Sequence, residues 1–143
     1  GSMLPILIFA IRWGVYPGGV VGIVFGTLQF ILGPKYSFHP ISILFDYSVA
    51  WMFMGLAGLF RNKGIVGVYA GVILAVLGRF LCHVLSGVVV FSSYTPEGQN
   101  PIIYSMVYNV SYLGVELVIA LILFTLLYKP LKRFIHSNAP LAE

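Results

Sequence analysis

Hydrophobic residues gather into four long runs along this chain, with short polar connections between them. A helix needs about 20 mostly apolar residues to cross the hydrocarbon core of a bilayer. The runs that reach or approach this length are Pro17 to Gly33, Pro40 to Phe60, Gly64 to Phe91 and Pro101 to Tyr128. Each of them predicts a transmembrane helix.

Prolines stand at the start of three of these runs, at Pro17, Pro40 and Pro101. Proline at the first position of a helix costs no hydrogen bond, because the first N–H groups have no partner within the helix. We therefore expect these three helices to begin at their prolines. A shorter apolar segment, Leu4 to Ala10, precedes them. At about 1.5 Å per residue it covers part of a membrane, which indicates half a helix or the remainder of a longer one.

Composition excludes a water-soluble domain. Hydrophobic residues make up 59% of the chain and charged residues 8%, with a mean hydropathy of +0.99, whereas soluble domains carry about 25% charged residues. We expect an all-α fold, a polytopic transmembrane bundle of about five helices, as a single domain over residues 1–143. Gly1, Ser2 and Met3 are interpreted as a cloning remnant. The lone Cys82 is expected to be a buried structural thiol.

The basic residues flank the apolar runs and form no single solvated face, which argues against nucleic-acid binding. Basic residues on one predicted side of the membrane are Arg12, Arg61, Lys63, Lys129, Lys132 and Arg133. The positive-inside rule makes this side cytoplasmic and predicts a multi-pass protein of the cell membrane with a cytoplasmic C-terminus. The short first segment would then begin outside, so we expect a further helix before it, either removed or supplied by a partner.

Glycines recur at every fourth position in the first long run, at Gly14, Gly18, Gly22 and Gly26. Such a stripe lets a neighbouring backbone approach one helix face closely. Two interpretations follow: packing within this bundle, which we favour, or docking onto a separate membrane subunit.

Ionisable side chains interrupt the runs at Asp46, Arg79, His83 and Glu116. A charge at bilayer depth costs several kcal/mol unless it is paired or wet, so each is a candidate for function. The predicted topology brings them to the outer half of the membrane, together with Asn109. The aromatic residues expected at the same level are Tyr36, Tyr47, Phe91, Tyr94 and Tyr104. A pocket of this kind suits a flat, polar, cationic ring.

Structural explanations remain open for these residues. Asp46 and Arg79 can form a structural ion pair, and His83 can be a satisfied core histidine. Glu116 can bond to Tyr112 or Asn109. Tyrosines at the outer level, Tyr36 and Tyr94, are also typical of an interfacial belt.

Catalysis and metal binding find little support in the sequence. Ser86 and His83 are three residues apart, but no third partner completes a triad. A single histidine at membrane depth, with scattered carboxylates, makes no convincing metal site. The phosphate-binding glycine loop with its lysine is absent, so any ATP use belongs to another subunit. We therefore expect no enzyme activity and no cofactor.

Three segments resemble the thiamine-specific substrate-binding component of energy-coupling-factor importers, and the likeness runs through almost the whole chain. They are Asp46-Tyr47 with Met54 to Phe60, Arg79 to His83 with Ser86-Gly87, and Tyr104-Ser105 with Tyr108-Asn109. The family has Glu, Lys and Trp at the positions of Asp46, Arg79 and Phe91. The resemblance implies a six-helix fold with both termini cytoplasmic, of which this chain lacks the first helix. It also implies a subunit that docks on a transmembrane coupling protein driven by two ATPases.

The same resemblance implies an outer-half thiamine pocket. Its expected lining is Tyr36, Asp46, Tyr47, Arg79, His83, Phe91, Tyr104 and Asn109. The Asp46 carboxylate would hydrogen-bond to the aminopyrimidine of thiamine, and His83 with an aromatic residue would flank the thiazolium ring. Our leading hypothesis is thus a membrane-embedded capture subunit for thiamine or a related pyrimidine or thiazole compound. The alternative is a structural or regulatory membrane subunit, held together by an Asp46–Arg79 pair and binding no ligand.

Overall fold

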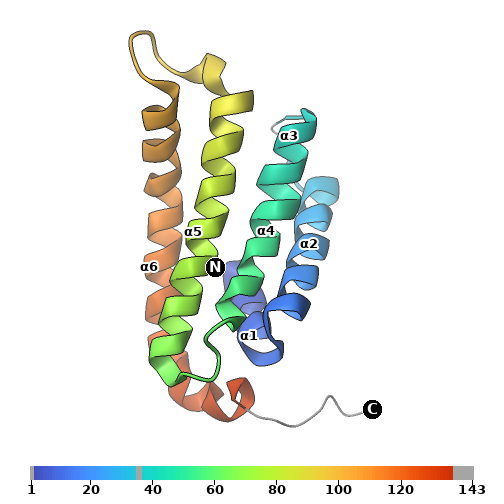
Figure 1. The fold of residues 1–143 in the computed structure, drawn as a ribbon, viewed down its shortest axis with the longest axis vertical. Coiled ribbons are helices and arrows are strands. Elements are labelled where there is room, and N and C mark those ends of the chain that lie inside the picture. Colours follow the sequence, from blue (N-terminus) through green and yellow to red (C-terminus); the bar gives the residue numbers. More distant parts are fainter. Residues whose placement is uncertain (1, 35–36, 137–143) are drawn as a thin grey trace.

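A computed structural model describes residues 2–34 and 37–136, and within these ranges the chain is helical without strands (Figure 1). The helices are α1 (Met3–Trp13), α2 (Val15–Leu32), α3 (Pro40–Ser42), η1 (Ile43–Val49), α4 (Ala50–Met52), η2 (Phe53–Gly58), α5 (Gly64–Val90), η3 (Ser92–Tyr94) and α6 (Pro101–Ile135). Because α3, η1, α4 and η2 continue one another, the chain has four segments long and apolar enough to span a membrane, with α1 shorter. The prediction of an all-α polytopic bundle of about five helices is confirmed.

Two of the three predicted proline starts are confirmed. Pro40 and Pro101 occupy the first turn, and the preceding residues cap these helices: His39 Nδ1 accepts a hydrogen bond from Ile41 N, and Asn100 Oδ1 from Ile102 N. The start at Pro17 is wrong by two residues, because α2 begins at Val15. Pro17 still lies in the first turn of α2, where a backbone N–H would have no partner within the helix.

Figure 1 shows two distinct ends of the bundle. The α1–α2 turn, the η2–α5 connection and the last turns of α6 meet at one end, while α3 and η3 lie at the other. The first end carries the six flanking basic residues predicted to share one side, and we call it the basic end. Lys35 lies outside the described residues.

The apolar core fills the half of the bundle toward the basic end, where α1 is inserted between the longer helices. Leu7, Ala10 and Ile11 of α1 are fully buried against Trp51 and Phe124. In a membrane such packing stabilises through van der Waals contact, because lipid tails are as apolar as leucine. Since α1 has only 11 residues, it supports this half of the bundle and does not fill the other.

Three glycines of the predicted stripe pack within the bundle, as favoured above. A Cβ on Gly18 would collide with Ala10, one on Gly22 with the carbonyl of Trp51, and one on Gly26 with the carbonyl of Tyr47. Gly14 differs, because it forms the break between α1 and α2 with φ 103°, a conformation that glycine adopts readily. The alternative of docking through the stripe is therefore wrong for these three glycines.

Substitution of Gly22 by alanine is expected to lower thermal stability, because the added methyl group meets backbone and cannot be relieved by a side-chain rotation. Overpacking of this kind costs about 1–3 kcal/mol. Thermal unfolding of the purified protein in detergent measures the effect. Gly114→Ala is the matched control, because its Cβ meets nothing closer than Val110 Cγ1 at 3.9 Å. Equal melting temperatures for the two variants would contradict this packing.

The last helix is longer than its apolar run. We expected it to end near Tyr128, but α6 continues through Pro130 to Ile135. Proline inside a helix removes one hydrogen bond and bends the helix without necessarily ending it. Beyond Pro130 the helix turns beneath the bundle (Figure 1), where Phe134 meets the ring of Trp13 edge-on at 5.6 Å between centroids.

Candidate functional site

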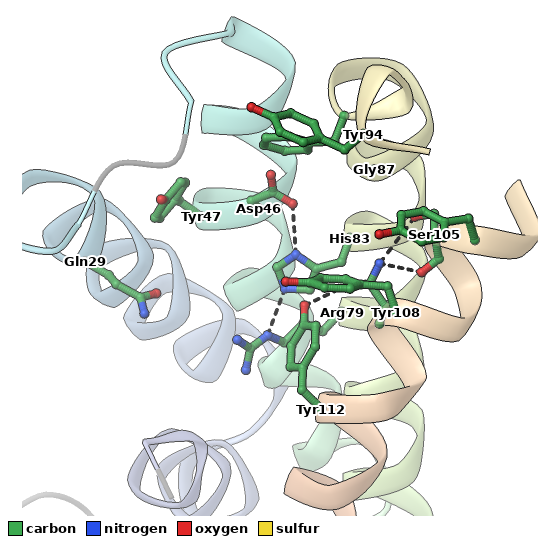
Figure 2. A pocket seen from close by; sticks show the side chains of 13 residues that line it. Gln29, Asp46, Tyr47, Arg79, His83, Gly87, Tyr94, Ser105, Tyr108 and Tyr112 are labelled. Atoms are coloured by element: carbon green, nitrogen blue, oxygen red, sulfur yellow. Dashed lines mark hydrogen bonds and ion pairs between the residues drawn. The ribbon is translucent and has the colours of Figure 1, made fainter. Parts of the chain in front are cut away.

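A cavity of about 660 Å³ lies in the half of the bundle away from the basic end (Figure 2). The residues that line it are Gln29, Asp46, Tyr47, Arg79, His83, Gly87, Phe91, Tyr94, Tyr104, Ser105, Tyr108, Asn109 and Tyr112. Tyr94 is 73% exposed at the rim and Arg79 8% exposed at the floor. The cavity therefore opens near η3 and closes on the apolar core.

Seven of the eight residues predicted to bind ligand line this cavity: Asp46, Tyr47, Arg79, His83, Phe91, Tyr104 and Asn109. The eighth, Tyr36, lies outside the described residues. The expectation that polar groups of three separate runs meet around one hollow is confirmed as geometry, whereas their role in binding stays a prediction.

Asp46 and Tyr47 lie in the π-helical segment η1. A π-helix bonds each N–H to the carbonyl five residues earlier, so it is wider than an α-helix and turns side chains by a smaller angle per residue. Asp46 points toward α5, where it meets Ser86 and His83, whereas Tyr47 points toward α2, where its ring meets Phe30 edge-on with 5.1 Å between centroids. The two neighbours therefore line different walls of the cavity.

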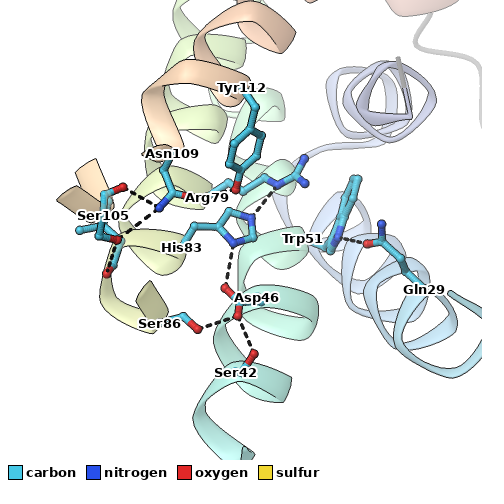
Figure 3. Close-up of polar contacts among 11 residues, drawn as sticks. Gln29, Ser42, Asp46, Trp51, Arg79, His83, Ser86, Ser105, Asn109 and Tyr112 are labelled. Atoms are coloured by element: carbon cyan, nitrogen blue, oxygen red, sulfur yellow. Dashed lines mark hydrogen bonds and ion pairs between the residues drawn. The ribbon is translucent and has the colours of Figure 1, made fainter. Parts of the chain in front are cut away.

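Three donors converge on the Asp46 carboxylate (Figure 3). Ser42 and Ser86 hydroxyls both donate to Oδ2, at 2.7 and 2.6 Å, and His83 Nδ1 lies 2.8 Å from Oδ1. Each carboxylate oxygen has two acceptor positions, so Oδ2 is saturated and Oδ1 retains one. Because Asp46 lines the cavity, this remaining position is available to a donor on a bound molecule.

The protonation of His83 follows from its two partners. Arg79 Nε donates to His83 Nε2 at 3.2 Å, and an arginine can only donate. Nε2 must therefore be the unprotonated nitrogen, which leaves the proton on Nδ1 to be donated to Asp46. The geometry thus assigns a neutral imidazole, which accepts a hydrogen bond from Arg79 and donates one to Asp46.

Arg79 pairs with Glu116, with 3.5 Å between Nη1 and Oε2. Its guanidinium also lies over the ring of Trp51, 4.2 Å from the centroid, a favourable cation–π contact. The alternative of an Asp46–Arg79 ion pair is therefore wrong, because His83 stands between the two. Glu116 lies outside the cavity lining, so Asp46 is the carboxylate of this cluster that faces the cavity.

The α6 wall of the cavity is held by its own hydrogen bonds. Asn109 Nδ2 donates to the Ser105 carbonyl at 2.8 Å, and Tyr112 donates to Asn109 Oδ1 at 2.7 Å. The expectation that Glu116 bonds Tyr112 or Asn109 is wrong, since Glu116 pairs with Arg79. The two tyrosine rings of Tyr108 and Tyr112 meet edge-on at 5.9 Å, so this wall presents aromatic surface.

Contacts typical of catalysis are missing from the described part of the cluster. Ser86 donates to Asp46 and not to His83, so the described residues contain no serine–histidine pair here. Across residues 2–34 and 37–136, no three His, Cys, Asp or Glu side chains gather as a metal site. The arrangement is suited to holding a ligand.

Sequence analysis did not identify every lining residue as a candidate. Tyr108 and Tyr112 belong to the polar face of α6 that carries Asn109, so helical spacing points to them. Gln29 was missed altogether. The signal that could have identified it is an amide within an otherwise apolar run. Such a polar group is a candidate for function in the same way as an intramembrane charge.

Comparison with known proteins agrees with this fold. The family described as thiamine transporter protein (Thia_YuaJ) matches residues 2–136. Thiamine transporter ThiT of Bacillus subtilis (strain 168) is 34% identical, over 95% of this chain and 77% of that protein. Thiamine transporter ThiT of Lacticaseibacillus paracasei (strain ATCC 334) is 30% identical, over 76% of this chain and 61% of that protein.

A solved structure of ThiT from Listeria monocytogenes has the same fold, with a TM-score of 0.85 at 23% identity, over 93% of this chain and 79% of that one. The family match extends over nearly all of the helices that surround the cavity. The resemblance read from the three polar segments is thereby confirmed, and this multi-pass membrane protein belongs to the thiamine transporter protein family.

Proposed function

We propose that this chain captures thiamine in the cavity between η1, α5 and α6, without catalysis of its own. The observation that carries the proposal is the Asp46 carboxylate in the cavity wall, which three side chains hold in place and which keeps one free acceptor position on Oδ1. Thiamine joins a cationic thiazolium ring to an aminopyrimidine, so it offers both the opposite charge and an amine donor.

The size and lining of the cavity support the same ligand. Small-molecule sites typically measure about 300–1,000 Å³ and combine aromatic walls with a few fixed polar groups. Here Phe91, Tyr104, Tyr108 and Tyr112 supply aromatic surface, on which a cationic ring is stabilised. In the proposed pose, Asp46 accepts the pyrimidine amine, while His83 and a tyrosine flank the thiazolium ring.

Orientation and partners form the second part of the proposal. The flanking basic residues gather at the end opposite the cavity mouth, and the positive-inside rule puts that end, with the C-terminus, in the cytoplasm. The cavity then opens outward. The 143 residues contain no phosphate-binding glycine loop, so we propose that an energy-coupling-factor transmembrane protein and two ATPase subunits drive release inward.

Isothermal titration calorimetry of the purified protein with thiamine tests the proposal. We expect saturable 1:1 binding, accompanied by quenching of tyrosine and Trp51 fluorescence, because tyrosine rings line the cavity and Trp51 lies directly behind Arg79. If thiamine, its phosphates and its free pyrimidine half produce neither heat nor quenching, the vitamin-binding function is refuted. A structural or regulatory membrane subunit that binds no ligand is then the better explanation.

A further inference from the structure

Gln29 differs from the other polar residues of the cavity because it comes from α2, opposite the polar faces of α5 and α6 (Figure 2). Its side chain accepts one hydrogen bond, from Trp51 Nε1 at 2.7 Å. An indole N–H can only donate, so the atom that it meets must be the amide oxygen. The orientation of the amide is therefore fixed by chemistry.

The two N–H donors of this amide have no hydrogen-bond partner among the described residues, and the side chain lines the cavity. Unpaired donors within an apolar helix are costly unless they face water or a ligand. The donors therefore belong to the wet side of α2, where a bound molecule would meet them.

Trp51 holds this amide firmly in place. The indole is fully buried, its N–H bonds Gln29, and its face supports the Arg79 guanidinium (Figure 3). One rigid ring thus positions two donor groups, the Gln29 amide and the Arg79 guanidinium. A group held by a locked neighbour loses little freedom on binding, which favours specific recognition.

We propose that Gln29 is a specificity-determining residue, whose amide N–H, positioned by Trp51, donates to an uncharged acceptor atom of the bound ligand. The inference rests on the proposed thiamine binding, and two atoms of thiamine satisfy it. One is a pyrimidine ring nitrogen, and the other is the oxygen of the hydroxyethyl side chain. Asp46 would then accept a hydrogen bond from the ligand, and Gln29 would donate one to it.

Calorimetry of Gln29→Met tests the inference, because methionine keeps the length of the side chain and removes both donors. Loss of one hydrogen bond to a neutral acceptor raises the Kd for thiamine about 3- to 10-fold. Thr27→Val is the matched control: it lies on α2, outside the cavity lining, and loses only its bond to the Ile23 carbonyl. Its Kd should stay within about twofold of the parent value.

Two analogues identify the acceptor. If Gln29 bonds the hydroxyl, the penalty of Gln29→Met vanishes for thiamine without that hydroxyl. If it bonds the ring nitrogen, the same penalty persists for that analogue and for the free pyrimidine half. The role of Trp51 is tested by a double-mutant cycle: Trp51→Phe should weaken thiamine binding in the parent protein and add nothing to the Kd in the Gln29→Met background.

The outcomes separate this inference from the proposed function. Parent protein that fails to bind thiamine overturns the function itself. Parent protein that binds thiamine, with Gln29→Met binding equally well or Thr27→Val losing as much affinity, overturns the role of Gln29 and leaves the function standing.

Discussion

Asp46→Ala is expected to abolish measurable thiamine binding, the largest single effect in this protein. The substitution removes the carboxylate that three side chains hold in place, the free acceptor position on Oδ1, and the negative charge that balances a cationic ligand. A hydrogen bond to a charged group contributes about 1.5–3 kcal/mol, so this contact accounts for a loss of about 10- to 150-fold, with the lost charge adding to it. Calorimetry measures the result.

Asp46→Asn and Glu97→Gln complete this experiment. The asparagine variant keeps the shape of the side chain and removes its charge, so it should bind at least about 10-fold more weakly than the parent if charge balance matters. Glu97 is an exposed acid beyond η3, outside the cavity lining, and its replacement changes the net charge equally without altering the site. Equal binding by Asp46→Asn and the parent would refute the electrostatic part of the account.

Arg79→Met is expected to damage both stability and binding. Glu116 then loses its partner, and His83 loses the donor that fixes its tautomer. Breaking a fully buried ion pair costs about 3–5 kcal/mol. Glu116 retains 30% exposure, so we expect about 1–3 kcal/mol here, a fall in Tm of roughly 4–10 °C. Thermal unfolding and calorimetry on the same sample measure the two effects.

The double variant Arg79→Met with Glu116→Gln separates the two roles of Arg79. Removing the orphaned charge should restore most of the Tm, because an ion pair replaced by neutral groups is often neutral for stability. Thiamine binding should stay weak, since nothing then orients His83 toward Asp46. Recovery of binding together with stability would mean that the cluster has a structural role only.

The location of the site could be predicted from the sequence because charges in lipid-facing runs stand out. Arg79 and His83 lie one turn apart on a 27-residue apolar helix, so their shared face follows from helical spacing alone. Asp46 interrupts the neighbouring span. The alternation of basic and non-basic connections then gave the direction of each span. With the directions known, the polar residues of the three spans could be placed at the same depth without knowledge of their contacts.

The pairing of these charges could not be predicted in the same way. Asp46 lies in the π-helical segment Ile43–Val49 and meets His83, not Arg79, and no residue pattern in that segment predicts a π-helical turn. Gly87 packs so closely against Ser105 that a Cβ there would collide with the hydroxyl. The resulting α5–α6 distance, which brings Glu116 to Arg79, is a long-range effect of packing.

Uncharged groups and helix ends were harder to predict for related reasons. Gln29 carries no charge and was read as part of its apolar run, although the bond from Trp51 shows that its amide is oriented. The last turns of α6 lie beyond the apolar run that ends at Tyr128. Their ordered position depends on Phe134 meeting Trp13, a contact between the two ends of the described chain that local periodicity does not encode.

A structure of this protein with thiamine bound tests the central claim most directly. We predict ligand density in the cavity, with the pyrimidine amine about 2.7–3.2 Å from Asp46 Oδ1 and the thiazolium ring beside His83 and a tyrosine of α6. Density for thiamine at another place, or an empty cavity at saturating ligand with Asp46 still bonded to Ser42, Ser86 and His83, would contradict it.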